Sequence, residues 1–280
     1  MQKVLSIQSS VVSGHVGNDA AALPLQRQGI EVWCVPTALY SNHPAHGTYQ
    51  GRMLPAAEVE ALIGGVVDLH GFSECGAVLS GYLGLAATGA VVAKSVRRVR
   101  RANPAALYVC DPVFGDHGRR YVAADIVDVI RRDLVPLADI LTPNAFEAAD
   151  LSDSEISGVT DACRAAGILS DGGRRRVIVT GIEAGEAIAT VIADGAARWQ
   201  VTTPRLDHPA HGAGDLFAAL LVGHLLHGNA IADAAARAVS SVYGIVEQAA
   251  ARGDGDLPLV EAQELLVSPA HRFSAGPIPA

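Results

Sequence analysis

Short runs of β-branched residues alternate with longer alanine- and leucine-rich segments along almost the whole chain. The expected strands cover residues 3–8, 30–35, 76–81, 106–111, 139–141, 177–180, 187–193 and 198–202. The expected helices cover residues 18–28, 56–69, 87–101, 124–133, 145–151, 160–171, 214–227, 232–250 and 258–266. Strands that alternate with helices form βα units, in which neighbouring strands run parallel. The pattern therefore predicts an α/β fold with a central, mostly parallel sheet flanked by helices on both faces.

One pair of expected strands has no helix between its members. The segments AIATVIADG and AARWQVT meet at Asp194-Gly195, which is typical of a β-hairpin, so we expect an antiparallel edge. Half of the 280 residues are hydrophobic, which is ample for a buried core. Because no low-complexity linker and no internal repeat interrupts the chain, we expect a single domain over residues 1–280.

Charge and composition exclude several classes of protein. The net charge of -8 draws the chain neither to nucleic acid nor to an anionic membrane. No apolar run reaches the roughly 18 residues of a membrane span, and the start MQKVLSIQSS lacks the pattern of a secretion signal. The four cysteines form no C-x-x-C pair, so neither a disulfide framework nor a cysteine zinc site is expected. We expect a soluble, cytoplasmic protein.

Polar residues and glycines follow the expected strands of the parallel sheet. They are Ser9, the loop SNHPAHG at 41–47, GYLG at 81–84, Asp111, TPNAFE at 142–147 and Thr180-Gly181. In open α/β sheets, ligands bind beyond the carboxyl ends of the strands. Since core packing alone does not require polar groups there, the sequence predicts a ligand site at this edge.

The segment HGAGDLFAALLVGHLLHG, residues 211–228, is the sharpest indication of chemistry. Gly212, Ala213 and Gly214 lead into an apolar helix, whose unpaired N–H groups and positive dipole end form an anion site. Asp215 at this site is either a helix cap or a catalytic base. An anion hole beside a carboxylate base is what transfer of a phosphoryl group to an alcohol requires.

Two further carboxylates fall on the same edge of the sheet. Asp111 and Glu147 can each be explained as a helix cap or a surface carboxylate. Together they favour a Mg²⁺ site, because Mg²⁺ takes carboxylate ligands directly or through its waters.

Histidines occur in pairs that superficially suggest a metal centre. The pentapeptide HPAHG appears at 43–47 and again at 208–212. We expect no shared metal site, because each pair contains a proline and lies in a loop. His224 and His227 lie three residues apart without a third ligand at fixed spacing, so we expect core histidines there.

A set of longer motifs keeps its order from one end of the chain to the other. The segments are SIQSSVVSGHVGN at 6–18, WCVPT-x-x-YSNH at 33–43, LSGYLG at 79–84, YVCDPVFGD at 108–116, DILTPNAFE at 139–147, GAGDLFAALL at 212–221 and HRFSA at 271–275. GAGD before an apolar helix together with TPN-x-x-E resembles the ribokinase-like family of small-molecule kinases. The full set resembles the pyridoxal kinase branch of that family.

The resemblance implies a ribokinase-like fold, a homodimer and phosphorylation of the 5'-hydroxyl of pyridoxal, pyridoxine or pyridoxamine by MgATP in vitamin B6 salvage. It implies Asp215 as the base and the amides of Gly212, Ala213 and Gly214 as the anion hole. Around the acceptor it places Ser9, Val12, His43 and Tyr82. Around the ATP phosphates and Mg²⁺ it places Asp111, Thr142, Asn144, Glu147 and Thr180, with Thr203 to Leu206 beside the nucleotide. The loop GDHGRRYV, residues 115–122, would be a flap over the donor.

Two positions depart from the pattern of this branch. Pro44 and Ala45 stand where pyridoxal kinases commonly carry a polar pair, and Gly181 stands where many carry a polar or basic side chain. Other interpretations therefore stay open: a hydroxymethylpyrimidine or sugar kinase of the same superfamily, or a non-catalytic carrier of pyridoxal phosphate. The SNH and GYLG segments favour a pyridoxal kinase, and the intact GAGD turn favours catalysis.

Overall fold

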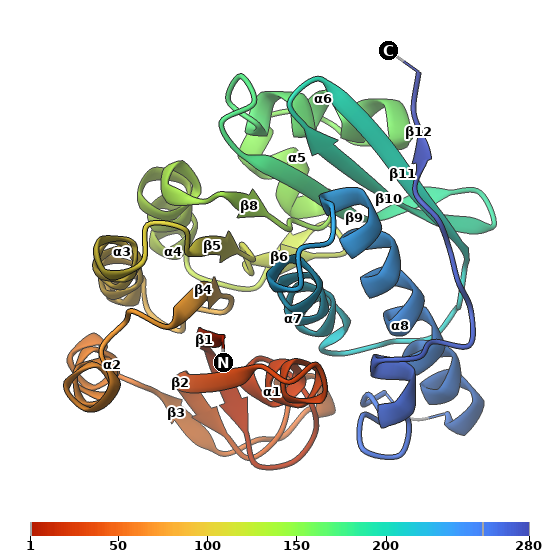
Figure 1. Ribbon diagram of the computed structural model, residues 1–280. Helices are drawn as coiled ribbons and strands as arrows, with labels where there is room; N and C mark the ends of the chain where they lie inside the picture. The colour runs from red at the N-terminus through yellow and green to blue at the C-terminus, as the bar shows by residue number, and fades with distance from the viewer. Residues whose placement is uncertain (1, 254, 280) are drawn as a thin grey trace.

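The computed structural model describes residues 2–253 and 255–279, and its centre is a mixed sheet (Figure 1). In these residues the strand order is β12-β11-β10-β9-β8-β5-β4-β1-β2-β3. The strands are β1 (Lys3–Val11), β2 (Glu31–Tyr40), β3 (Gly51–Met53), β4 (Cys75–Ser80), β5 (Leu107–Cys110), β8 (Ile140–Leu141), β9 (Arg176–Ala184), β10 (Ala187–Asp194), β11 (Ala197–Pro204) and β12 (Gly276–Pro277). The run from β9 to β2 is parallel, as predicted.

Helices cover both faces of this sheet. They are α1 (Asn18–Arg27), α2 (Ala56–His70), α3 (Ala86–Ala102), α4 (Ala124–Val129), α5 (Ala145–Ser152), α6 (Val159–Leu169), α7 (Ala213–Leu226) and α8 (Ile231–Arg252). Figure 1 shows α1, α7 and α8 on one side of the strands and α2, α3 and α4 on the other. No helix in the described part of the chain is long and apolar enough to cross a membrane.

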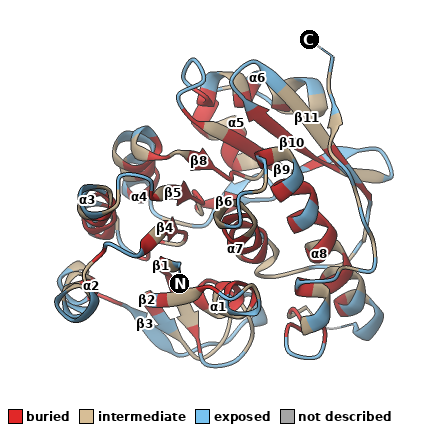
Figure 2. Ribbon diagram, viewed as in Figure 1, coloured by how far each residue is buried: buried red, intermediate tan, exposed pale blue. Residues whose placement is uncertain are grey.

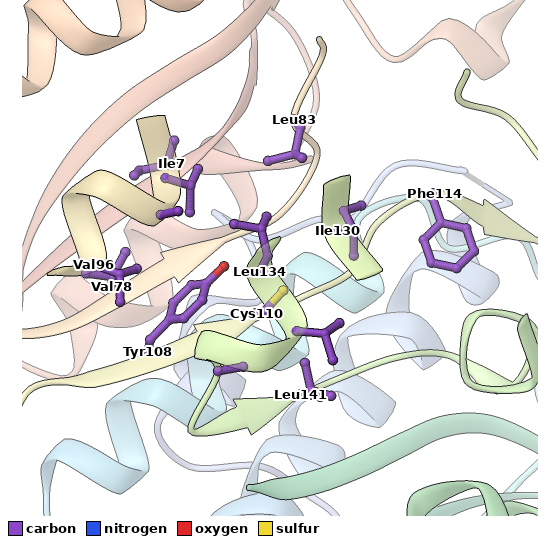
Figure 3. Close-up of a cluster of buried hydrophobic side chains, with 14 of the residues drawn as sticks. Ile7, Val78, Leu83, Val96, Tyr108, Cys110, Phe114, Ile130, Leu134 and Leu141 are labelled. Carbon is purple, nitrogen blue, oxygen red and sulfur yellow. The ribbon is translucent and has the colours of Figure 1, made fainter. Parts of the chain in front are cut away.

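The core has one layer on each face of the sheet. Along β1, Val4 packs with the α1, α7 and α8 layer, whereas Leu5 and Ile7 pack with the other layer. Figure 3 shows part of that second layer, with Ile7, Tyr108 and Leu141 among its side chains. Burial on both faces explains why the central strands are largely apolar, although β1 also buries the polar Ser6 and Gln8. Figure 2 shows exposed residues mainly on the outer helices and loops.

Both edges of the sheet are antiparallel. The predicted hairpin is present, since β10 pairs with β11 from Ala187↔Pro204 to Asp194↔Ala197. The other edge, where β3 pairs antiparallel with β2, was not predicted. The residues of β3 are all exposed, so this strand has no hydrophobic pattern that the sequence could display.

The helix expected over residues 258–266 is wrong. The segment consists of turns followed by a short 3-10 helix, Gln263–Leu266. Leu257, Leu259 and Ala262 are buried against the α1, α7 and α8 layer. Their apolar periodicity therefore reflects a turn anchored in the core.

Candidate active site

The N-terminus of α7 carries the GAGD turn. Gly212 caps the helix with a left-handed φ of 87°, and a Cβ added there would lie 2.1 Å from the carbonyl oxygen of His15. Only glycine fits both the backbone angle and this close approach. Ala213 and Gly214 form the first helical turn with Asp215. The Ala213 N–H donates to the Ala210 carbonyl at 3.2 Å, so within the described part of the chain the Gly212 and Gly214 N–H groups are the ones of this turn left for an anion.

Asp215 is not a helix cap, so that interpretation is wrong. Its Oδ2 accepts a hydrogen bond of 2.8 Å from the backbone N–H of Gly17, in the loop between β1 and α1. Burial raises the pKa of this carboxyl to about 6, and the Gly17 N–H opposes the rise. The group is thus a stronger base than an ordinary aspartate and remains ionised at neutral pH.

Asp111 follows β5 at the same edge. It is 6% exposed, and its Oδ1 accepts a 2.8 Å hydrogen bond from the hydroxyl of Thr142. Burial raises the pKa of Asp111 to about 7, with a further contribution from the charge of Asp215 and an opposing one from Thr142. Because the charges of Asp111 and Asp215 interact, the carboxyl end of β5 and the N-terminus of α7 lie close together at this edge of the sheet.

Glu147 is a helix cap, which was one of its two predicted roles. It forms a capping box with Asn144 at the start of α5. Its Oε1 accepts from the N–H groups of Phe114 and Gly115 at 3.0 and 3.4 Å, and its Oε2 accepts from the Asn144 N–H at 3.0 Å. Burial and the nearby Asp111 hold the pKa of Glu147 well above its usual range, against these N–H groups.

The arrangement of the Asp111, Glu147 and Asp215 carboxylates tests the expected Mg²⁺ site. Over residues 2–253 and 255–279, no group of three or more His, Cys, Asp or Glu side chains is arranged to hold a metal ion. The buried Asp111 and Glu147 carboxyls nevertheless repel each other electrostatically, and Asp111 is also repelled by Asp215. This donor set fits Mg²⁺, which keeps several waters and completes its shell with phosphate oxygens.

A cavity of about 250 Å³ adjoins the GAGD turn. Its lining brings together five predicted site residues, which are Thr180, Thr203, Leu206, Ala213 and Gly214. The other lining residues come from β9, β10, β11, α7 and α8: Gly181, Ile188, Thr190, Pro204, Phe217, Val239, Val242, Tyr243 and Val246. The sequence did not predict that α8 forms an apolar wall of this cavity. Its residues carry only the periodicity of an amphipathic helix, which gives no sign of a ligand.

The residues expected around the acceptor lie at the end of β1 and in the loops that follow β1, β2 and β4. Ser9 is buried, and the carbonyl of Ser9 would be 2.2 Å from a Cβ at Gly17. The hydroxyl of Thr37 donates a 2.6 Å hydrogen bond to the Tyr82 carbonyl, which ties the GYLG segment to β2. Val12 is 91% exposed and contributes to no covered wall, so its role stays a prediction.

The expected flap is a small hairpin of β6 (Gly115–Asp116) and β7 (Arg119–Arg120). Arg120 forms an ion pair with Asp150 on α5. Asp150 also forms an ion pair with Arg131. Arg120 therefore serves to hold the hairpin against α5. Arg119 is exposed.

The histidine expectations have mixed outcomes. His227 is exposed and bonds to the carbonyl of Gln28, and His224 is half-buried, so neither is a core histidine. The two HPAHG loops were expected to face one site, and they contact each other: the rings of His43 and His211 lie 4.6 Å apart.

A family model described as phosphomethylpyrimidine kinase matches residues 24–260, which is most of the chain. The chain belongs to the phosphomethylpyrimidine kinase family. Within this kinase family, it is 45% identical over 276 residues to the pyridoxal kinase PdxY of Rubrobacter xylanophilus, covering 96% of this chain and 95% of the relative. It is 38% identical over 275 residues to that of Corynebacterium diphtheriae, covering 96% and 97%.

Solved structures of the family confirm the predicted fold. The pyridoxal kinase of Leishmania donovani in complex with ADP and pyridoxamine superimposes with a TM-score of 0.94 at 29% identity, covering 100% of both chains. That of Entamoeba histolytica has a TM-score of 0.93 at 25% identity, covering 99% of this chain and 100% of the other. The resemblance to pyridoxal kinases inferred from the motifs is therefore confirmed.

Proposed function

We propose that this protein is an ATP-dependent kinase that phosphorylates the 5'-hydroxyl of pyridoxal. The observation that carries the proposal is the Asp215 carboxylate, which accepts the Gly17 N–H beside the Gly212 and Gly214 amides and has a pKa raised to about 6. Relatives named pyridoxal kinase and a related structure with ADP and pyridoxamine support the choice of substrates.

Asp215 would accept the proton of the hydroxyl as its oxygen attacks the γ-phosphorus. The amides of Gly212 and Gly214 would donate hydrogen bonds to the phosphoryl oxygens, where negative charge develops during transfer. The Ala213 amide would join them only by giving up its 3.2 Å hydrogen bond to the Ala210 carbonyl. Both groups belong to one helical turn, so the base and the anion hole keep a fixed relation to each other.

The donor would occupy the cavity beside this turn, with Thr180, Thr203 and Leu206 along the nucleotide. Thr142 and Asn144 would lie near its phosphates. Mg²⁺, when bound, neutralises charge on the phosphates. We assign Asp111 to hold it directly and Glu147 to hold it through water, because both Glu147 oxygens already accept backbone N–H groups.

The acceptor ring would lie among Ser9, Val12, His43 and Tyr82. In this arrangement Ser9 would hydrogen-bond the pyridine ring, His43 would lie in the loop over it, and Val12 and Tyr82 would flank it. We further propose that the whole chain acts as one kinase domain in the cytoplasm, in vitamin B6 salvage.

Product formation from ATP tests the proposal with four acceptors side by side: pyridoxal, pyridoxine, pyridoxamine and hydroxymethylpyrimidine. We expect the highest kcat/KM on pyridoxal. The last acceptor is included because the family model is that of phosphomethylpyrimidine kinase. Turnover on hydroxymethylpyrimidine alone would identify the other kinase, and binding of pyridoxal phosphate without any turnover would identify a carrier.

We also propose that the protein is a homodimer formed through the β3 edge. All of β3 is exposed: its apolar Met53 is 39% exposed, and the apolar Leu39 on the neighbouring β2 is 45% exposed. An uncovered strand edge with apolar neighbours favours pairing. Sedimentation equilibrium should give a dimer that Met53→Asp converts to monomer, whereas Ile168→Asp on α6, a site also exposed, should leave the dimer intact. A monomeric wild type would refute this assembly.

A further inference from the structure

The two copies of HPAHG, far apart in the sequence, form one contact in the fold. His43 precedes the 3-10 helix Pro44–His46 in the loop after β2, and His211 directly precedes the cap of α7. Their ring centroids lie 4.6 Å apart, with planes inclined by 31°. The ring of His46 approaches His211 edge-on at 6.3 Å. The loop expected over the acceptor is thereby joined to the residue that leads into the GAGD turn.

A third segment, which follows α8, holds this contact from behind. His46 Nε2 donates a 3.1 Å hydrogen bond to Asp256 Oδ1. The backbone N–H of His211 donates to the Gly255 carbonyl at 3.3 Å, and His211 forms a β-bridge with Asp256. Asp256 therefore contacts both copies of the pentapeptide, one through its side chain and the other through its backbone.

The ring contact favours uncharged imidazoles. Nδ1 of His43 accepts from the Ala45 N–H at 3.4 Å, which places the proton of the neutral ring on Nε2. Burial lowers the pKa of His43, followed by His211 and His46, while Asp256 opposes them. Burial also lowers the pKa of His211, against Asp256 and with a smaller contribution from His46. These are the titratable groups that face the pair.

We propose that His211 is a positioning residue for the acceptor: its ring holds His43, and with it the loop at 41–47, over the GAGD turn. The inference rests on the proposed kinase function, and it assigns His211 no contact with the reacting atoms. By holding this loop, the His211 ring keeps the loop at a fixed position relative to the helix turn that carries the base and the anion hole. A loop with Pro44 and Ala45 at its centre offers no side-chain hydrogen bond of its own there, so the ring contact supplies the anchor.

The contact has a defined dependence on pH. Because both pKa values are lowered in the closed arrangement, the contact is at full strength above the ordinary histidine pKa of 6.5 and weakens as protons bind below it. Acidification should therefore raise the KM for pyridoxal, and this rise depends in part on an imidazole at position 211.

Two substitutions at His211 test the inference. His211→Gln removes the ring and should raise the KM for pyridoxal at pH 8 about threefold to tenfold, as expected for loss of one ring contact, with kcat nearly unchanged. His211→Phe keeps a ring that cannot be protonated, so it should restore the KM and reduce its rise between pH 7 and pH 5.5 to the part that His43 contributes. The control His70→Gln removes another stacked ring, 5.5 Å from Trp33 and outside these loops, and should change neither. An unchanged KM in His211→Gln, or a Phe variant that behaves like the Gln variant, would overturn the proposal.

A second measurement decides the contact without any kinase activity. Hydrogen exchange of backbone amides in residues 41–50 of the substrate-free protein should be faster in His211→Gln than in the wild type or in His70→Gln. Equal exchange in all three proteins would refute the anchor. A wild type that exchanges slowly but does not phosphorylate pyridoxal would instead refute the proposed function and leave the contact in place.

Discussion

Asp215→Asn should lower kcat for pyridoxal roughly 100- to 10,000-fold, the range for loss of a general base. The amide oxygen of asparagine can still accept the Gly17 N–H, so the loop between β1 and α1 keeps its anchor on α7. The asparagine amide is, however, not basic enough to remove the proton from the hydroxyl of the acceptor. Initial rates with saturating ATP and pyridoxal measure the effect.

Binding measurements separate this loss from a damaged site. Calorimetric titration should give the same affinity for a non-hydrolysable ATP analogue in both proteins, because the donor cavity is lined by other side chains. Turnover within tenfold of the wild type would remove Asp215 from the role of base.

The same carboxyl should appear in the pH profile of kcat. Its pKa is raised to about 6, and the base acts only when ionised, so kcat should fall as the pH drops through about 6. This acid limb differs from the effect of His211, which acts on the KM for pyridoxal. It should persist in His211→Phe.

The sequence predicts the parallel part of the sheet well because each central strand is buried on both faces. Leu5 and Ile7 face one helical layer and Val4 the other, so apolar residues fall on both faces of this strand rather than on one. At the edges this signal disappears. The exposed β3 and the two-residue β12 owe their pairing to neighbours in space, which a local pattern does not contain.

Site residues divide in the same way. Positions after strands, such as Asp111, could be found because the topology places all of these ends at one edge. What each carboxylate does there depends on contacts across the fold. Glu147 caps its own helix, whereas Asp215, an equally plausible cap by sequence, accepts from Gly17 of a distant loop. The contact between His43 and His211 is of this kind too, since no spacing rule relates their two loops.

Gly212→Ala is the second substitution that should nearly abolish activity, and it acts through the backbone alone. The residue adopts a φ of 87°, and a Cβ would stand 2.1 Å from the His15 carbonyl oxygen. Either α7 must retreat or the loop at His15 must move, and both displace the amides of the anion hole from the transferring phosphoryl group. We expect kcat/KM to fall at least about 100-fold, the loss typical of a misplaced oxyanion donor.

The matched control is Gly65→Ala, at an exposed glycine on α2 that belongs neither to the GAGD turn nor to the lining of the donor cavity. Its φ is not left-handed, and no atom lies within 4 Å of an added Cβ. Helix propensity alone favours alanine there by about 1 kcal/mol, so the fold should be at least as stable. Thermal unfolding and kcat/KM for both variants provide the comparison: a loss of activity confined to Gly212→Ala indicates that the backbone position of the cap controls catalysis. Equal activities would show that the amides at this turn do not bind the phosphoryl group.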